Sequence, residues 1–313
     1  MAPVSAISQP PSPNPRAASR VWLRLAALCY LDFMQRRQFL EMTAGAAAAS
    51  RLIAQSRTAG YKVGMCCWNM RDFEPTVFEV AAKIGLDGVQ LGISRDDQQT
   101  LKLRRPEVQR QYIEAARRAG VAIVGTACQF RRPLKTEPVA AIVLHDWIDV
   151  TAKLGAKVIL VPFFGQENIV DANNQQEFDR LVAVLKELGP RAEQAGVILG
   201  LENTLSAVDN RKILEAVGSP AVQVYYDVGN STNNGHPVLA EIPALGAARI
   251  CEFHIKDGKS LLGQGKIDMP AVAAAIRSTG YDKWLVLETA SPTDLVADTR
   301  TNLEYTRRVF TRG

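Results

Sequence analysis

Eight short apolar segments, each followed by a longer segment with helical spacing, account for most of residues 61–313. The apolar segments span 61–68, 87–93, 121–128, 156–164, 197–203, 222–230, 248–257 and 284–290. Segments such as TVFEVAAKIG and EVQRQYIEAARRAG separate them and repeat apolar residues every three to four positions, as amphipathic helices do. Eight strand–helix units over about 250 residues predict an α/β fold, a single-domain (β/α)8 TIM barrel.

Glycines at the ends of the helical segments support this prediction. A glycine stands just before the next apolar segment at Gly85, Gly120, Gly155, Gly196 and Gly280. Glycine adopts the left-handed conformation that commonly ends a helix. An open, doubly wound sheet is the alternative, but no G-x-G-x-x-G motif follows the first strand, so the phosphate loop of a dinucleotide-binding fold is missing.

The positive charge of the chain is concentrated in its first residues. Residues 1–60 carry seven arginines and two acidic side chains, so their net charge of +5 equals that of the whole chain. The remainder is formally neutral and has no basic stripe, so we expect no nucleic-acid partner.

Residues 1–59 are interpreted as an N-terminal leader in front of the barrel, which we place at 60–313. From Met34, the segment MQRRQFLEMTAGAAAASRLIAQS has twin arginines, Arg36 and Arg37, before a small-residue run, and it resembles a twin-arginine export signal. We interpret residues 1–33 as an extension upstream of the true start. The segment predicts the twin-arginine export machinery as a partner and a periplasmic or secreted location; a basic, Ala-rich disordered tail is the alternative.

Four successive apolar segments, the fifth to the eighth, end in a side chain that can bind a metal. These residues are Glu202, Asp227, His254 and Glu288. Because the strands of a barrel place their carboxyl ends at one face, we expect the four side chains to converge. Three carboxylates and an imidazole in an apolar surrounding require a compensating cation. We therefore predict one divalent metal ion, with Mn²⁺ favoured and Mg²⁺, Co²⁺ or Zn²⁺ as alternatives; isolated carboxylates that cap loops are the simpler alternative.

The cysteines outside the leader give no sign of a disulfide framework or a structural zinc site. Cys66, Cys67, Cys128 and Cys251 all fall in apolar segments and none is spaced as a CxxC pair. We interpret them as small, buried thiols.

Four sequence motifs carry a resemblance to a known family. LGLEN, YYDVGN, EFHIKDGKSLLGQGKIDM and GYDKWLVLET are similar, in order and spacing, to the sugar phosphate isomerase/epimerase family with a xylose isomerase-like barrel. This family includes ketose 3-epimerases, hydroxypyruvate isomerases and inosose dehydratases. The resemblance implies that Glu202, Asp227, His254 and Glu288 bind one metal ion, and that Glu202 and Glu288 are the catalytic bases that exchange a substrate proton.

The sequence departs from the epimerase pattern at Asn230. Ketose 3-epimerases commonly have a histidine at this position, and asparagine cannot carry a proton at neutral pH. Further candidates for substrate binding, besides Asn230, are Lys256, Trp68, His236 and Arg131. His145 falls in a helical segment and is expected to lie on the helix surface without a role.

Three classes of function follow. The first is a metal-dependent isomerase or epimerase that acts on an unphosphorylated sugar or keto-sugar through an enediolate. The second is a metal-dependent lyase or dehydratase of keto-sugars, keto-glycosides or inosoles, which the asparagine at 230 favours. The third is a non-catalytic sugar-binding barrel. In each case the partner is a small carbohydrate, and assembly into a homo-oligomer is compatible with the sequence.

Overall fold

The structure, a computed structural model, describes residues 60–165 and 167–311. The predicted leader, with Arg36 and Arg37, lies outside the described residues. The predicted boundary between leader and barrel is therefore not tested. Within the described part of the chain, no helix has the length and apolar character needed to cross a bilayer.

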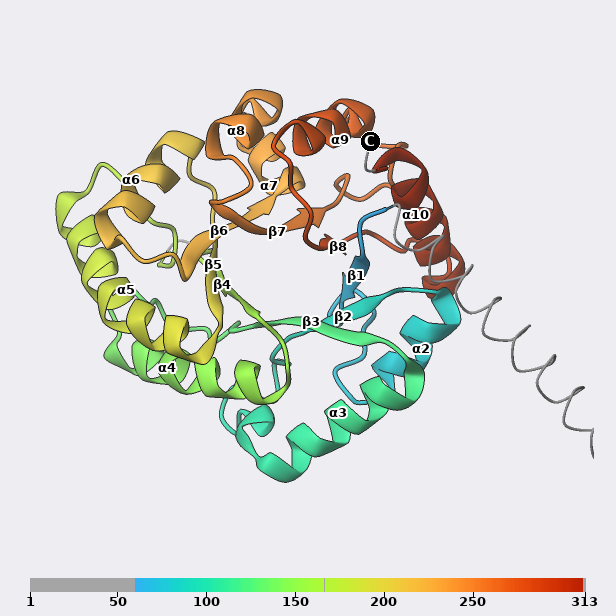
Figure 1. The fold of residues 1–313 in the computed structure, drawn as a ribbon, viewed down its shortest axis with the longest axis horizontal. Coiled ribbons are helices and arrows are strands. Elements are labelled where there is room, and N and C mark those ends of the chain that lie inside the picture. The colour runs from blue at the N-terminus through green and yellow to red at the C-terminus, as the bar shows by residue number, and fades with distance from the viewer. Residues whose placement is uncertain (1–59, 166, 312–313) are drawn as a thin grey trace, which may run out of the picture. The chain divides into compact units, whose positions relative to one another are not determined.

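Eight parallel strands form a closed barrel in which each strand pairs with its neighbours in sequence and the last pairs with the first. Figure 1 shows the strands as a central ring. Their bounds are β1 Val63–Cys66, β2 Gly88–Leu91, β3 Ala122–Ala127, β4 Val158–Pro162, β5 Ile198–Glu202, β6 Val222–Asp227, β7 Ile250–Ile255 and β8 Leu285–Leu287.

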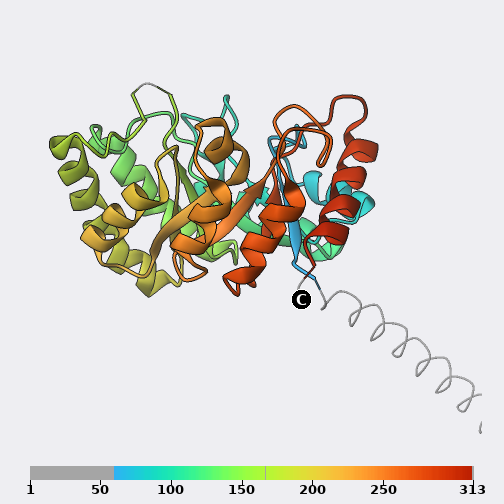
Figure 2. The same ribbon diagram turned by 90° about the horizontal axis from the view of Figure 1, so that it is seen from above.

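Helices surround this ring and connect each strand to the next. They are α2 Val77–Ile84, α3 Pro106–Ala119, α4 Pro138–Lys153, α5 Gln175–Ala195, α6 Ala207–Val217, α7 Val228–Asn233, α8 Val238–Leu245, α9 Met269–Ser278 and α10 Leu295–Val309, with a 3₁₀ helix, η1, at Lys102–Arg104. Figure 2 shows the barrel from the side, with β1 in blue rising from the lower end and long loops projecting at the upper end, where the strands finish.

The predicted (β/α)8 barrel is therefore confirmed. Each strand lies within one of the eight apolar segments, although it is shorter at one or both ends. The five glycines expected at helix ends all have positive φ, from 66° at Gly120 and Gly196 to 97° at Gly85. A left-handed residue there lets the chain leave the helix and enter the next strand at once.

Strand register brings the predicted metal ligands to the same end of the barrel. Asp227 in β6 is the Cα partner of His254 in β7, and His254 is in turn the partner of Val286 in β8. Glu288 follows β8 directly. Glu202 closes β5 opposite Pro162 of β4. Parallel pairing thus places four side chains on four adjacent strand ends, as a barrel requires.

The lower half of the barrel interior is filled tightly by apolar side chains and permits little change. Val124 reaches across from β3 toward glycines in β1 and β2. A methyl group added at Gly88 would lie 2.4 Å from Val124 Cγ2, and one at Gly64 would lie 2.8 Å from the same atom. These glycines make room for the valine, so this end of the barrel is a packed core and the open space lies at the opposite end.

Candidate active site

The four predicted ligands lie together at the ends of β5 to β8. His254 Nδ1 lies 3.1 Å from Glu202 Oε1, 3.5 Å from Asp227 Oδ2 and 3.6 Å from Glu288 Oε2. One ligand atom from each of the four lies within 4.8 Å of the others. Glu202, Asp227 and His254 are buried, whereas Glu288 is partly exposed.

This donor set fits a divalent cation. Carboxylate oxygens and an imidazole nitrogen that bind one ion at about 2.0–2.2 Å lie no more than about 4.4 Å apart, close to the observed spread. Three carboxylates in a buried place also need positive charge near them. The residues present would therefore hold a divalent ion with three oxygens and one nitrogen.

Lys256 supplies part of that positive charge. Its Nζ lies 2.8 Å from Asp227 Oδ2 and 2.5 Å from Glu288 Oε2. Burial alone would lower the pKa of Lys256, but the charges of Asp227 and Glu288 outweigh this and raise the pKa above its usual value. The lysine is thus a permanent cation at the centre of the site, where the sequence predicted a substrate contact.

The second ring nitrogen of His254 contacts a residue that the sequence analysis did not identify. His254 Nε2 lies 3.0 Å from Gln90 Oε1 in β2, and this oxygen can only accept, so Nε2 carries the hydrogen. Gln90 Nε2 donates in turn to the Tyr225 hydroxyl at 3.1 Å. The Tyr225 ring packs edge-on against the imidazole with centroids 4.5 Å apart. Gln90 therefore fixes the ring so that Nδ1 faces the carboxylates.

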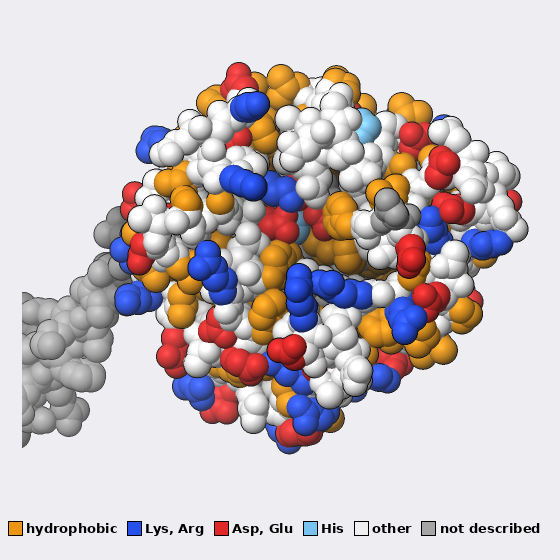
Figure 3. Space-filling view, turned by 180° about the vertical axis from the view of Figure 1, so that it is seen from behind, with side chains coloured by type: hydrophobic (Ala, Val, Ile, Leu, Met, Phe, Trp, Pro, Cys, Tyr) orange, Lys and Arg blue, Asp and Glu red, His pale blue; other side chains and the backbone are white. Residues whose placement is uncertain are grey.

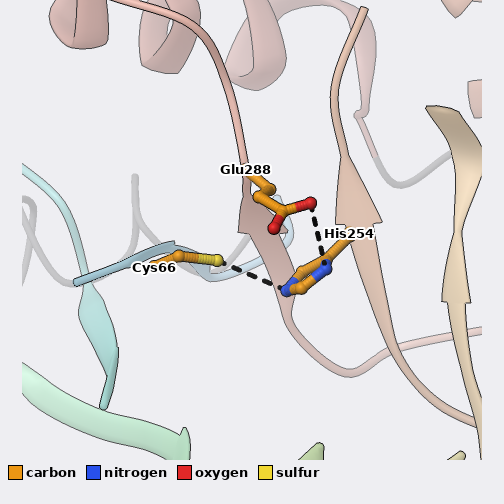
Figure 4. Close-up of side chains that lie close together, drawn as sticks. All are labelled: Cys66, His254 and Glu288. Carbon is orange, nitrogen blue, oxygen red and sulfur yellow. Dashed lines mark hydrogen bonds and ion pairs between the residues drawn. The ribbon is translucent and has the colours of Figure 1, made fainter. Parts of the chain in front are cut away.

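Cys66 lies on the same side of the imidazole as Gln90. Its Sγ is 3.3 Å from His254 Nε2 and donates to Gln90 Oε1 at 3.3 Å. Figure 4 shows His254 between Cys66 at one ring nitrogen and Glu288 at the other. Burial raises the pKa of the Cys66 thiol to about 12, and only a thiolate is a good metal ligand. The structure confirms that the Cys66 thiol is buried, as predicted. The sequence analysis did not predict its contact with His254.

The two candidate bases have different surroundings. Burial raises the pKa of Glu202 to about 7, against the opposing effect of the His254 charge. Burial would also raise the pKa of Asp227, but the hydrogen bond from His254 and the charge of Lys256 hold it well below its usual value. Without a bound cation, therefore, Asp227 stays ionised, whereas Glu202 can exchange a proton near neutral pH.

Trp68 and Asn230 each contact one of the candidate bases. Trp68 Nε1 donates to Glu288 Oε1 at 2.9 Å, and Asn230 Nδ2 donates to Glu202 Oε1 at 3.4 Å. The backbone N–H of Asn230 also donates to Asp227 Oδ1 at 2.7 Å, where Asp227 caps helix α7. The local fold after β6 therefore holds the candidate metal ligand Asp227 and the amide of Asn230 together.

A cavity of about 250 Å³ opens directly onto these groups, and we call it the inner cavity. Trp68, Asn230, Lys256, Glu202 and Glu288, all predicted from the sequence, line it together with Gln129, Leu160, Pro162 and Phe164. Figure 3 shows a hollow in the face turned away from the viewer in Figure 1, with acidic and histidine side chains at its floor and Lys and Arg side chains around it.

A second, larger cavity of about 790 Å³ adjoins the first, and we call it the outer chamber. It is lined by Trp68, Phe73, Ile93, Ser94, Arg95, Asp96, Gln129, Phe130, Arg131, Pro162, Phe164 and Asn168. Four of these residues, Trp68, Gln129, Pro162 and Phe164, also line the inner cavity. Arg131 thus borders the outer chamber and does not reach the ligand cluster.

The other two histidines lie elsewhere. His236 Nε2 lies 2.8 Å from the Thr204 carbonyl oxygen, and Nδ1 lies 3.7 Å from Glu241 Oε1. It lines neither cavity, so the structure does not bring this predicted substrate contact to the site. His145 lies on the outer surface of α4 with Nδ1 3.5 Å from Asp146, as expected.

Comparison with known proteins gives matches over most of the chain. A family model described as the xylose isomerase-like TIM barrel matches residues 78–309. The 2-epi-5-epi-valiolone 7-phosphate 2-epimerase of Actinoplanes sp. is 29% identical over 257 residues, which cover 79% of this chain and 94% of that protein.

Two solved structures share the fold at lower sequence identity. D-psicose 3-epimerase from Clostridium cellulolyticum H10, solved with D-tagatose, has a TM-score of 0.68 and 17% identity, and the match covers 80% of this chain and 99% of that one. The IOLI protein, solved with a bound zinc atom, has a TM-score of 0.66 and 17% identity over 80% of this chain and 98% of that one.

Proposed function

Because the chain belongs to the xylose isomerase-like TIM-barrel family, we propose that it is a divalent-metal-dependent sugar isomerase or epimerase that acts through an enediolate on an unphosphorylated sugar or keto-sugar. The observation that carries this proposal is the convergence of Glu202, Asp227, His254 and Glu288 at one end of the barrel, around a cavity. Two of these carboxylates, Glu202 and Glu288, face that cavity.

The reaction requires removal of a proton from a carbon beside a carbonyl group. A divalent ion held by the four ligands would supply Lewis-acid stabilisation of the charge that develops on the substrate oxygens. Glu202 lies at the wall of the inner cavity, where its carboxylate is suited to take the proton. Glu288 is oriented by Trp68 and Lys256 and is suited to return a proton from its own side of the cavity.

Lys256 and Asn230 would hold the substrate between these bases. The Lys256 ammonium lies half-buried beside Glu288 and lines the inner cavity, where it can donate to a substrate oxygen. The Asn230 amide lines the same cavity and can donate to a hydroxyl group, but it cannot relay a proton.

The relatives support the reaction class and the metal. The Actinoplanes relative is a 2-epimerase, the solved Clostridium protein is a 3-epimerase that holds D-tagatose, and the IOLI protein binds zinc. We favour Mn²⁺ for this chain because three of the four ligands are carboxylate oxygens, and keep Mg²⁺, Co²⁺ and Zn²⁺ as alternatives.

A metal-dependent lyase or dehydratase of keto-sugars, keto-glycosides or inosoles is the second candidate. Asn230 favours it, because the side chain beside Glu202 cannot return a proton to the substrate. With a leaving group on the neighbouring carbon, proton removal by Glu202 then ends in elimination.

Deuterium exchange distinguishes these functions. Purified protein loaded separately with Mn²⁺, Mg²⁺, Co²⁺ or Zn²⁺ is incubated in D₂O with a panel of ketoses, inososes and keto-glycosides. Exchange with inversion or isomerisation supports the first candidate, and exchange with loss of a leaving group supports the second. Protein that binds these sugars without exchange under any metal would be a binding barrel. Glu202→Gln and Glu288→Gln should each lower exchange by at least about 100-fold.

We also propose that residues 34–59 direct export by the twin-arginine pathway to the periplasm or beyond. The Arg36–Arg37 pair and the small-residue run after it support this proposal. Replacement of both arginines by lysine should keep the full-length protein in the cytoplasm, as measured by cell fractionation. Export that persists in this variant would contradict the proposal.

A further inference from the structure

We propose that the outer chamber is a binding subsite for a second ring, a sugar or a ring-shaped aglycone, so that the substrate is a keto-sugar glycoside and not a free monosaccharide. This inference rests on the proposed function, since it assumes that the keto-sugar unit reacts in the inner cavity. The chamber itself is defined by its own residues, and its binding can be measured without turnover.

The sizes of the two cavities are the first argument. The inner cavity of about 250 Å³ is close to the lower end of the range for small-molecule pockets, about 300–1,000 Å³, and is suited to a single sugar unit. The outer chamber of about 790 Å³ adds roughly three times that space. Because Trp68, Gln129, Pro162 and Phe164 line both, a ligand can extend from one into the other.

Aromatic side chains are the second argument. Trp68, Phe73, Phe130 and Phe164 all line the chamber, and all are only half-buried. Partly exposed aromatic rings are costly to leave in water, and several around one cavity mark a place where a flat apolar face binds. The face of a pyranose ring or of an aromatic aglycone is such a surface.

The polar side chains of the chamber are the third argument. Arg95, Asp96 and Arg131 are exposed there, and among the described residues their side chains have no ion pair or hydrogen bond, whereas the neighbouring Arg132 pairs with Glu137. Two guanidinium groups and a carboxylate offer donors and acceptors together, which suits hydroxyl groups. Because two arginines face one carboxylate, an anionic substituent is the competing occupant, and the phosphate ligand below distinguishes the two.

The residues that line only the outer chamber come from one half of the barrel, and the four predicted metal ligands come from the other half. Loops that follow β1 to β4 supply the residues specific to the outer chamber, whereas the ends of β5 to β8 supply the metal ligands. The loops after β1 to β4 can therefore change to recognise a different second ring, and the reactive groups at the ends of β5 to β8 stay in place.

Three ligands that differ only at one hydroxyl group test the inference. They are D-fructose, isomaltulose, which carries a glucosyl group on O6 of the same ketose, and D-fructose 6-phosphate. Binding to the Mn²⁺-loaded protein is measured by calorimetry, and deuterium exchange is followed in parallel. We expect isomaltulose to bind at least tenfold more tightly than D-fructose.

Variants of residues that line only the outer chamber test whether the tighter binding of isomaltulose arises there. Phe73→Ala and Phe130→Ala should each weaken isomaltulose binding about two- to tenfold and leave D-fructose binding unchanged, because neither ring lines the inner cavity. Phe130→Leu keeps the apolar bulk and guards against loss of folding; it should show the same selective loss. Ile142→Ala, at an exposed position of α4, is the control and should alter neither ligand.

Each outcome decides the inference. Equal binding of D-fructose and isomaltulose, or a loss in the variants that is the same for both, overturns it, even if both ligands exchange deuterium and the proposed reaction stands. Preference for the phosphate, abolished by Arg95→Gln or Arg131→Gln, overturns it in favour of an anionic substituent. Selective isomaltulose binding without any exchange supports the subsite and counts against the proposed reaction instead.

Discussion

Gln90 is a single buried amide in contact with the candidate metal ligand His254. It accepts from His254 Nε2 at 3.0 Å, and it lies on the opposite side of the imidazole from the carboxylates. Partners of this kind fix the ring orientation of a ligating histidine, and their loss typically lowers metal affinity 10- to 100-fold.

We therefore predict that Gln90→Met lowers the affinity for Mn²⁺ by about 10- to 100-fold. Gln90→Glu keeps an acceptor at the same place and should retain most of the affinity. Metal binding is measured by competition with a fluorescent chelator, and urea unfolding of the metal-free proteins checks that the fold persists. Wild-type affinity in the methionine variant would show that the glutamine does not orient His254.

A second residue-scale prediction concerns Glu252, which lies inside the barrel with a pKa that burial raises to about 8. It faces Tyr225 of β6, Lys283 before β8 and His254 of its own strand. The folded protein keeps the proton up to about pH 8, whereas the unfolded chain releases it near pH 4.5. Between these values the carboxyl group therefore lowers the free energy of unfolding by about 1.4 kcal/mol per pH unit as the pH rises.

Glu252→Gln removes this titration, because an amide stays neutral in both states. Its free energy of unfolding relative to the wild type should rise steadily from pH 5 to pH 8 and level off above that. Urea unfolding of both proteins at four pH values gives the difference directly. A difference that does not vary with pH would mean that Glu252 is ionised in the folded protein.

For individual residues, the sequence predicted the candidate ligands at strand ends. It did not predict side chains that contact one another across the barrel interior. Glu202, Asp227, His254 and Glu288 each end an apolar run, and that position is visible in the sequence. Gln90 and His254 are 164 residues apart, so their contact depends on barrel closure and strand register. A lone glutamine within the apolar segment GVQL was the one available signal.

At the scale of elements, the strands and helix ends were predictable because their causes are local. Apolar periodicity and glycines at helix ends are visible within a few residues of sequence. All eight strands lie within the segments that these patterns predicted. The loops after β1 to β4 carry no such pattern, and Phe73, Arg95 and Phe130 come together only when the barrel closes. Of the residues that line the outer chamber, the sequence therefore predicted only Trp68 and Arg131 as substrate contacts, and the chamber itself could not be predicted.

Packing between strands leads to an element-scale prediction. A methyl group at Gly88 would lie 2.4 Å from Val124 Cγ2 and 3.1 Å from the Ala122 carbonyl oxygen. Gly88→Ala should therefore lower the free energy of unfolding by about 1–3 kcal/mol. Gly60→Ala is the matched control, since nothing lies within 4 Å of the added atom, and it should change stability by less than about 0.5 kcal/mol. Equal free energies of unfolding for the two variants in urea would contradict this prediction. They would show that β2 and β3 accommodate the added methyl group without loss of stability.

At the scale of the whole molecule, metal binding and folding should be coupled through the charge of the site. Glu202, Asp227 and Glu288 converge at the ends of β5, β6 and β8, and in the metal-free protein their neutralisation depends on Lys256 and His254. A ligand that binds only the folded state stabilises it by about 2.7 kcal/mol at 100 times its dissociation constant. Saturation with Mn²⁺ should therefore raise the unfolding midpoint of the wild type, and a chelator should reverse the change.

Lys256→Met tests this coupling, because it removes the ammonium group that contacts Asp227 and Glu288, the carboxylates expected to bind the metal. The metal-free variant should be less stable than the wild type, and Mn²⁺ should stabilise it by more than it stabilises the wild type. Lys283→Met is the matched control: its Nζ donates to the carbonyl oxygens of Ile250 and Ala247, away from the ligand cluster. It should lower both midpoints equally, so that the increment due to Mn²⁺ stays at the wild-type value. Thermal unfolding of the three proteins with Mn²⁺ and with chelator measures these increments. An increment in Lys256→Met equal to that of the control would mean that the lysine does not compete with the metal, and that the carboxylates are held apart by the barrel alone.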